Sequence, residues 1–390
     1  MSSDNNVDDD SLSCFRLKSE AHTWFTYNCC HFLGQSGISG KGFIEHLKEN
    51  PYACTITYSP LAKAIMNSVR MRGWVDIENE YYKLLVAIHN SGTLDMVKAG
   101  EINSQLECIR AKLAVYLLAV QNDSRYSCVR NESIRDIMLQ AINPRDVSVS
   151  SQCLLNKFIE SRVEYNDSQW HDLLSRYKDF NLHDRLNEAK SVAGRIRSQM
   201  IAKVPSYGFR KFDIDEFLLP DKILLLNFNY TSIADTYLPK AQIFKINHIH
   251  GTLADKNSII FGYGDELDKN YHALKETNEN EYLKNMKSVR YLESENYRKL
   301  LEFIDSDSFQ IYIMGHSCGN SDRTLLNTLF EHDNCVSIKP FYYQIDENSD
   351  NYLDIVQNIS RNFTDMRKMR DRVVNKTYCE PLPQSKNVSD

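Results

Sequence analysis

Short runs of Ile, Leu, Val and aromatic residues recur in the second half of this chain, each followed by a polar or glycine-containing turn. Continuous apolar runs, as opposed to strict alternation, are typical of strands that are covered on both faces. We therefore predict a parallel or mixed sheet with helices packed on either side. The predicted strands are residues 223–228, 243–249, 259–262, 309–315 and 336–345.

Between about residues 72 and 210 the apolar positions instead follow the 3.6-residue period of helices, as in ENEYYKLLVAIH. Asp76 is suited to cap the first of these helices, and Glu78 falls in its first turn, where a carboxylate opposes the helix dipole. Upstream, the segment WFTYNCCHFL at 24–33, the glycine-rich turn at 34–40 and FIEHLKEN predict a strand, a turn and a helix.

These patterns predict an α/β fold interrupted by a large all-helical insertion. In order along the chain, we expect a disordered acidic N-terminus at 1–22, the first part of the α/β core at 23–71, the helical insertion at 72–210, the main α/β core at 211–348, and C-terminal helices with a tail at 349–390.

Composition and charge narrow the classes of function. A net charge of -6 gives no electrostatic reason for general nucleic-acid binding, since neutralising phosphates takes a basic face. The 10 cysteines contain no C-x-x-C pair, which argues against a zinc ribbon or a thioredoxin-type redox site, and we predict no metal.

The N-terminus does not resemble a secretory signal, and the longest apolar run, at 111–120, is about half of what a bilayer crossing needs. We expect a cytoplasmic protein with no membrane partner.

The stretch GHSCG at 315–319 spells Gly-x-Ser-x-Gly, the nucleophile elbow of serine hydrolases, with Ser317 as the candidate nucleophile. Such a serine needs a histidine base that comes later in the chain. The only downstream histidine is His332, and a helix of about fifteen residues starting at the elbow would carry it about 20 Å away. The sequence therefore disfavours a serine hydrolase.

Polar residues and glycines cluster directly after the predicted strands. In open α/β sheets, ligands bind outside the carboxyl ends of the strands, and glycines let a phosphate or ribose approach the backbone. Asn227 and Asn229 are two apart, as are His248 and His250, so each pair would share one face of an extended strand. Each residue also has a purely structural interpretation, such as an Asx turn at Asn229, backbone bonds to His250 or a helix cap at Asp322. No single residue decides between the two.

As a set, these motifs resemble a known family. FNYT at 228–231, HIHG at 248–251, IIFG followed by Asp265, and GHSCGNSD at 315–322, in this order and spacing, are similar to the AbiH family of bacterial phage abortive-infection proteins. WVDIE at 74–78 resembles a W-x-D-x-E segment of that family. The resemblance runs from Trp74 to the tyrosine-rich strand at 341–343 and on into the C-terminal helices, so it covers most of the chain.

AbiH proteins are in turn similar to sirtuin-like, Rossmann-type domains that bind NAD. The resemblance implies that Asn229 lies near the nicotinamide ribose, that His250 is the general base, and that the loop of Gly315 and Ser317 holds ribose and phosphate. A histidine suits this role because its ordinary pKa, near 6.5, lets it accept a proton at cell pH. The nucleotide-binding residues so implied are Gly34, Gly37, Asn227, Tyr230, Thr231, His248, Gly251, Gly262, Asp265, Gly315, His316, Ser317 and Asp322.

One motif of the family is missing. AbiH members usually open with a strand that runs into Gly-Asn-Gly-Phe-Asp, and the nearest counterpart here is FLGQSGISGKGFIEHL at 32–47, which lacks the asparagine and the aspartate. Two hypotheses therefore stand. The first is an antiphage protein that hydrolyses NAD or a related nucleotide at the glycosidic bond. The second is a non-enzymatic nucleotide-binding sensor or interaction module, with a phage-encoded trigger or protein partner, and a homo-oligomer is compatible with either.

Overall fold

The computed structural model describes residues 15–18, 55–72, 76–91, 96–123, 131–175, 182–201, 215–237 and 244–384. The chain divides into two compact units, one drawn from Met1–Val115 and Ala273–Asn285, the other from Tyr116–His272 and Met286–Asp390. Gly34 and Gly37, with the strand, turn and helix predicted around them, lie outside the described residues.

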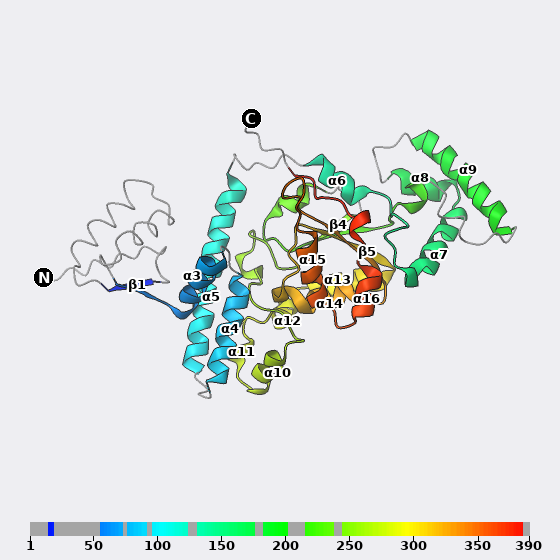
Figure 1. Ribbon diagram of the computed structural model, residues 1–390. Coiled ribbons are helices and arrows are strands. Elements are labelled where there is room, and N and C mark those ends of the chain that lie inside the picture. Colours follow the sequence, from blue (N-terminus) through cyan, green and yellow to red (C-terminus); the bar gives the residue numbers. More distant parts are fainter. Residues whose placement is uncertain are drawn as a thin grey trace. The chain divides into compact units, whose positions relative to one another are not determined.

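The first unit is built from an antiparallel pair of strands and several helices (Figure 1). A buried hydrogen-bond network holds it together, because the Tyr81 hydroxyl donates to Asn103 Oδ1 (2.7 Å) and Asn103 Nδ2 donates to the backbone oxygen of Glu281 (2.8 Å). Its elements are the antiparallel strands β1 (Phe15–Lys18) and β2 (Thr55–Tyr58), and the helices α3 (Pro60–Arg72), α4 (Ile77–Asn90), α11 (Asn280–Leu283) and most of α5 (Met96–Asn122).

The predicted cap of α4 is confirmed. The Asp76 carboxylate accepts a hydrogen bond from the backbone N–H of Asn79 (3.0 Å), and Glu78 lies in the first turn. Replacing Asp76 with Ala leaves this N–H without its partner, so we expect α4 to lose about 1 kcal/mol of local stability. Hydrogen-exchange mass spectrometry of α4 reports that loss directly. Glu101→Ala, at an exposed position inside α5, is the matched control, and equal losses from both variants would contradict the assignment.

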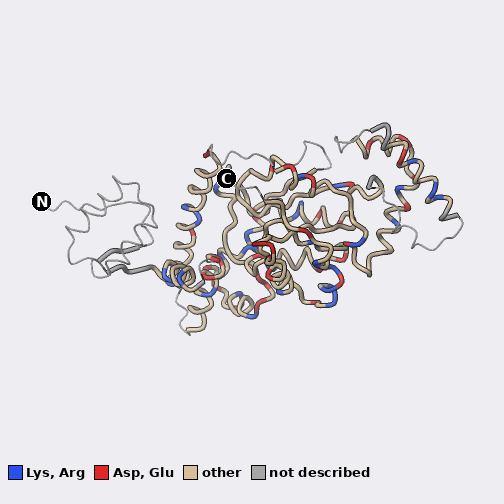
Figure 2. Tube along the Cα trace, turned by 45° about the horizontal axis from the view of Figure 1, so that its top comes forward, with Lys and Arg blue, Asp and Glu red and all other residues tan. Residues whose placement is uncertain are grey.

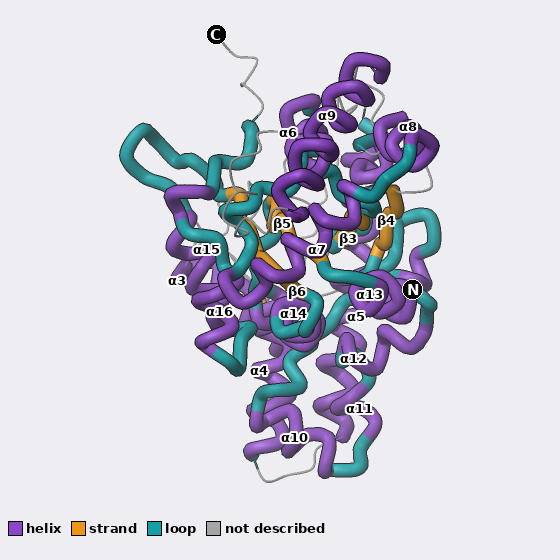
Figure 3. The backbone as a smooth tube through the Cα atoms, turned by 90° about the vertical axis from the view of Figure 1, so that its right-hand side faces the viewer, coloured by secondary structure: helices purple, strands orange, loops and turns teal. Residues whose placement is uncertain are grey.

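The second unit holds most of the helices. Figure 3 shows its strands lying between helices, as predicted for an α/β fold. Helices predicted within 72–210 are found in both units, and α5 and α10 each run from one unit into the other. The helices of this unit are α6 (Glu132–Leu139), α7 (Gln152–Val163), α8 (Asp167–Ser175), α9 (Leu182–Ile201), the first half of α10 (Lys269–Glu276), α12 (Lys287–Arg290), α13 (Asn296–Ser306), α14 (Arg323–Phe330), α15 (Tyr352–Arg361) and α16 (Met366–Arg372).

Two parallel pairs of strands form the β-structure of the second unit. Strand β3 (Ile223–Asn227) pairs with β4 (Phe244–His248), and β5 (Phe309–Met314) pairs with β6 (Cys335–Phe341). The mixed α/β class is therefore confirmed, with a mostly helical chain and small sheets. Within the described residues these strands belong to separate two-stranded sheets, and a single Rossmann-type sheet stays a prediction.

One predicted strand is wrong. Residues 259–262 form no strand, although Ile259 and Ile260 are buried. The backbone N–H of Ile260 bonds to the carbonyl of His250 (2.9 Å), and the next ladder contact is an isolated bridge between Tyr263 and Met286. A run of three apolar residues and a glycine is too short to distinguish a strand from a buried loop. Strand β6 also ends at Phe341, four residues before the predicted end, because the backbone N–H of Ile345 bonds to the turn at Ser349 (2.9 Å).

Strand β3 borders two hydrophobic cores. Leu224 and Leu226 pack against the core around Ile249, Ile313 and the helices α13 to α16, whereas Ile223 and Leu225 pack against the core of α7, α8 and α9. This alternation is the period of two expected for a strand covered on both faces.

Two charged residues of the C-terminal helices, Arg372 and Asp365, make hydrogen bonds within the fold. Figure 2 shows Lys and Arg interspersed with Asp and Glu along the described chain. Arg372 is buried and donates to the carbonyl of Phe330 (2.6 Å), and Asp365 caps α16 by accepting from the N–H groups of Arg367 and Lys368. No helix of the described chain is both long and apolar enough to cross a membrane.

Candidate functional site

Three strand ends of the second unit meet at one place. Phe228 follows β3, His250 lies two residues after β4, and His316 lies two residues after β5. The Phe228 ring contacts both histidines, with ring centroids 5.3 Å from His250 and 4.1 Å from His316. Residues that follow three different strands, Phe228, His250 and His316, therefore lie together.

Asp322 lies at the centre of a group that we call the strand-end cluster, made of His250, Lys287, Tyr291, His316 and Asp322. One carboxylate oxygen, Oδ1, lies 2.8 Å from Lys287 Nζ and 3.3 Å from His250 Nε2. The other, Oδ2, lies 3.5 Å from His316 Nε2, and the Tyr291 hydroxyl lies 3.2 Å from His250 Nε2. One carboxylate thus contacts two imidazoles and an ammonium.

Burial and neighbouring charges together determine the protonation states of Asp322 and His250. Burial alone would raise the pKa of Asp322, but the Lys287 ammonium, His250 and His316 together hold that pKa well below its ordinary value. Burial lowers the pKa of His250 and the Lys287 charge lowers it further, against the opposing effect of Asp322. At neutral pH, Asp322 is therefore ionised and His250 is neutral, the form that can accept a proton.

Within the strand-end cluster, His316 is the more exposed of the two histidines. Its side chain is 21% exposed, against 4% for His250 and 1% for the Lys287 side chain. The backbone N–H of Cys318 donates to His316 Nδ1 (3.0 Å), so that nitrogen is an acceptor and the proton lies on Nε2, facing Asp322. Both ring nitrogens are therefore engaged.

Asp322 does not cap α14 with its side chain, which corrects the structural interpretation of this residue. It occupies the position before the helix, but its carboxylate makes no capping bond and is directed to the cluster. Asp265 is likewise buried and pairs with Arg323 at the start of α14 (3.1 Å). Nearby, a Cβ on Gly264 would lie 3.1 Å from Lys287 Cβ, so this glycine permits close packing against the cluster.

Asn227, and not Asn229, forms the Asx-type turn after β3. Asn227 Oδ1 accepts from the N–H of Asn229 (3.1 Å), and Asn227 Nδ2 donates to the carbonyl of Thr231 (3.2 Å). The same amide lies 3.0 Å from His248 Nδ1, while His248 Nε2 lies 3.0 Å from Asp235. The side chain of Asn229 is exposed. His248 and His250 thus belong to different hydrogen-bond groups, because β4 ends at His248 and the strand alternation stops there.

The remaining predicted residues that the structure describes have contacts of their own. The Tyr230 hydroxyl donates to the carbonyl of Ile260 (3.2 Å), and Gly262 is buried. Gly251 and Gly315 have positive φ values of 84° and 73°, which glycine adopts without strain. Ser317 is exposed, and its carbonyl accepts from Asn358 Nδ2 (2.8 Å) on α15.

Ser317 lacks the geometry of a serine nucleophile within the described chain. His332 lies just beyond α14, where its Nε2 is 3.0 Å from Asp305, and no bond joins it to Ser317. Helix α14 has 8 residues, so it is shorter than the fifteen-residue helix that we expected after the elbow. The pairing of His332 with Asp305 therefore argues against a serine hydrolase.

Lys287 and Tyr291 were not among the predicted site residues. They lie on α12 and on the 3₁₀ turn that follows it, in a polar stretch without a glycine motif. Their contact with Asp322 and His250 spans 35 and 41 positions of the chain, so nothing in the local sequence indicates it.

A family model described as "Bacteriophage abortive infection AbiH" matches residues 41–344, which include the whole strand-end cluster. The chain belongs to the AbiH family. Searches of curated proteins and of solved structures found no match. Membership of the AbiH family suggests a role in phage abortive infection.

Proposed function

We propose that this AbiH protein acts in abortive infection by hydrolysing NAD or a related nucleotide at its glycosidic bond, with the strand-end cluster as the site of proton transfer. The observation that carries this proposal is the single ionised carboxylate of Asp322 in contact with two imidazoles, His250 at 3.3 Å and His316 at 3.5 Å. A carboxylate beside an imidazole stabilises the imidazolium that forms when the ring accepts a proton.

The reaction would consume one water. The water oxygen bonds to C1′ of the ribose, the bond from C1′ to the nicotinamide nitrogen breaks, and nicotinamide leaves with the electron pair. The proton of the water passes to neutral His250, and Asp322 stabilises the charged ring. Removing a coenzyme that carries hydride would stop the metabolism of an infected cell.

Exposed residues next to the cluster would hold the substrate. Asn229 follows Phe228 in the chain, and Gly315 and Ser317 flank His316, and all three are exposed. Asn229 would orient the ribose, and the loop at Gly315 and Ser317 would bind ribose and phosphate through backbone N–H groups. Tyr230 and Thr231 follow Asn229 in the same turn, and the turn of Gly251 is joined to it by the bond from the Leu253 N–H to the carbonyl of Tyr230 (3.0 Å).

The test is the release of nicotinamide from NAD by the purified protein. We expect His250→Gln to lower the rate by at least about 100-fold, since general-base catalysis contributes on that order. The glutamine keeps an amide N–H near the position of Nε2, so the variant is designed to fold. His332→Gln is the matched control, because His332 also pairs with an aspartate through Nε2 but lies outside the cluster. Equal rates for the two variants would refute the role of His250.

A second function, a nucleotide sensor without turnover, is favoured by a different observation. Both nitrogens of His316 are already engaged and His250 is buried, so the resting cluster offers no free base at the surface. A sensor would bind the nucleotide at Asn229, Gly315 and Ser317 and transmit the event to a phage-encoded or protein partner. NAD would then raise the melting temperature of the wild type while no nicotinamide appears, an outcome that excludes the hydrolase.

A further inference from the structure

Lys287 is the most deeply buried charged side chain of the strand-end cluster, with 1% of its side chain exposed. Its stem is held in place, because its backbone N–H donates to the carbonyl of Tyr263 (2.8 Å) and Gly264 packs closely against its Cβ. A lysine is seldom buried to this extent, since its ammonium loses hydration and needs a partner of opposite charge. Burial at this depth places a positive charge, held by Asp322, among the titratable groups of the cluster.

Lys287 and His250 contact the same oxygen of Asp322. Oδ1 lies 2.8 Å from Lys287 Nζ and 3.3 Å from His250 Nε2. The shorter contact is the hydrogen bond of an ammonium to a carboxylate, which is among the stronger hydrogen bonds in proteins. The carboxylate oxygen that would stabilise a charged His250 is therefore already paired with a cation.

The charges around His250 decide which form of its imidazole is stable. Among the described residues, the titratable groups that face it are Lys287 from α12, Tyr291 from the 3₁₀ turn that follows, Asp322 before α14 and His316 after β5. Burial is the larger cause of the lowered pKa of His250, the Lys287 charge is the next, and Asp322 opposes both. A second cation beside Lys287 would give a buried cluster with excess positive charge. Without Lys287, the same proton would instead neutralise the charge of Asp322.

We propose that Lys287 is a positioning residue, which occupies Asp322 Oδ1 as a cation and so keeps His250 an uncharged proton acceptor in the resting protein. An imidazolium has no lone pair with which to accept a proton, so a His250 charged in advance by Asp322 could not act as a base. Lys287 itself reaches no substrate, because its side chain is buried. This inference rests on the proposed function for its effect on turnover, but its effect on the His250 ring can be measured without turnover.

The first test is NMR of the full-length protein labelled with ¹³C in its histidine rings, followed between about pH 5 and 9. The His250 signal is identified by its loss in His250→Gln. In the wild type we expect His250 to take up a proton only below about pH 6.5, the ordinary value for histidine. Lys287→Met should raise the pKa of His250 by at least about 1, since it removes a nearby like charge and leaves the carboxylate in place.

Two further variants separate charge from packing. Lys287→Gln also removes the charge but keeps an N–H group that can donate to Asp322, so it provides the same measurement if Lys287→Met does not fold. Adding Asp322→Asn to Lys287→Met removes the carboxylate as well, and the pKa of His250 should fall again.

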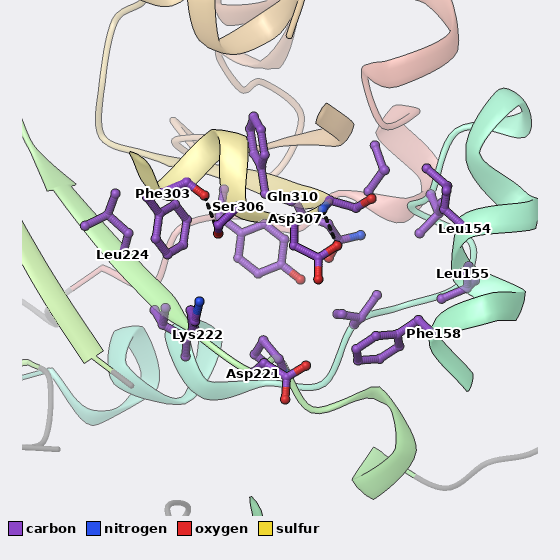
Figure 4. Close-up of a pocket in the computed structure, with 18 of the residues that line it drawn as sticks. Leu154, Leu155, Phe158, Asp221, Lys222, Leu224, Phe303, Ser306, Asp307 and Gln310 are labelled. Carbon is purple, nitrogen blue, oxygen red and sulfur yellow. Dashed lines mark hydrogen bonds between the residues drawn. The ribbon is translucent and has the colours of Figure 1, made fainter. Parts of the chain in front are cut away.

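Lys222→Met is the matched control. Lys222 is exposed and lies directly before β3, at the end of that strand away from Phe228, where it lines a cavity of about 590 Å³ (Figure 4). No residue of the strand-end cluster lines this cavity. The pKa of His250 and the rate of nicotinamide release should be the same in Lys222→Met as in the wild type.

The second test is the pH profile of nicotinamide release. The rate should fall as the pH drops through the pKa of His250, because the protonated ring is not a base. In Lys287→Met and Lys287→Gln, this fall should occur at a pH higher by at least about 1, with the rate recovering at alkaline pH. A lysine that only supported the fold would lower the rate by the same factor at every pH.

An unchanged or lowered pKa of His250 in either lysine variant would overturn the proposal, and so would an equal rise in Lys222→Met. A pKa that stayed high after Asp322→Asn was added would also overturn it, because the effect would then not pass through the shared carboxylate. A wild type that releases no nicotinamide would refute the proposed hydrolysis, but the NMR titration would still decide whether Lys287 controls the charge of His250.

Discussion

Replacing Gly251 with Ala is expected to destabilise the second unit by more than about 3 kcal/mol, enough to lower its melting temperature by about 10 °C. Gly251 has φ of 84°, where a Cβ is strained. A Cβ built there would lie 2.1 Å from the carbonyl oxygen of Ser258. The backbone of Ser258 cannot easily retreat, because its N–H bonds to Asp255 (3.0 Å) and its hydroxyl accepts from the N–H of Thr252 (3.1 Å).

Urea unfolding followed by the fluorescence of buried Trp170 measures this effect in the second unit. Gly194→Ala, inside α9, is the matched control, since a Cβ there meets nothing within 4 Å. That variant should gain about 0.5–1 kcal/mol, the usual preference of a helix interior for Ala over Gly. If Gly251→Ala unfolded at the same urea concentration as the wild type, the close approach of Gly251 to the carbonyl of Ser258 would be contradicted.

Removing the Asp322 carboxylate is expected to have the second large effect, on both stability and turnover. Asp322→Ala leaves the Lys287 ammonium, whose side chain is 1% exposed, without the carboxylate at 2.8 Å. Breaking a buried ion pair from one side costs about 3–5 kcal/mol, because the buried charge that remains loses the attraction of the carboxylate. Nicotinamide release, where present in the wild type, should vanish with it.

A double variant separates the effect of Asp322 on stability from its effect on turnover. Lys287→Met in the Asp322→Ala background removes the buried charge and should recover part of the lost stability, but it should not recover turnover. Asp305→Ala, which removes the mostly exposed partner of His332, is the control and should cost less than about 1 kcal/mol. A loss for Asp322→Ala no greater than that of Asp305→Ala would mean that Asp322 and Lys287 are not paired in solution.

The candidate site was predictable only in part. Sequence motifs that follow the predicted strands indicated His250, His316 and Asp322. Residues that follow parallel strands lie at the same edge of the sheet, whatever the order of those strands. The same reasoning placed Asn229 with them, yet its side chain is exposed and Asn227 makes the turn bonds. Which of two asparagines closes a turn depends on backbone angles that a spacing of two does not fix.

Local elements followed from local sequence. The cap at Asp76, the 3.6-residue period of the helices and four of the predicted strands are confirmed, since each depends on residues within one or two turns of one another. The segment 259–262 was wrong because burial of Ile259 and Ile260 within a loop leaves the same apolar run as burial in a strand.

By itself, then, the sequence determined the positions of helices and parallel strands, the turns that need glycine, and membership of a family through motifs in a set order. Only the tertiary structure decided that Asp322 joins His250 to Lys287, and that residues of β3, β5 and α7 line the same cavity. The physical reason is distance along the chain: periodicity and capping act between neighbours, whereas an ion pair or a cavity depends on how segments far apart are packed.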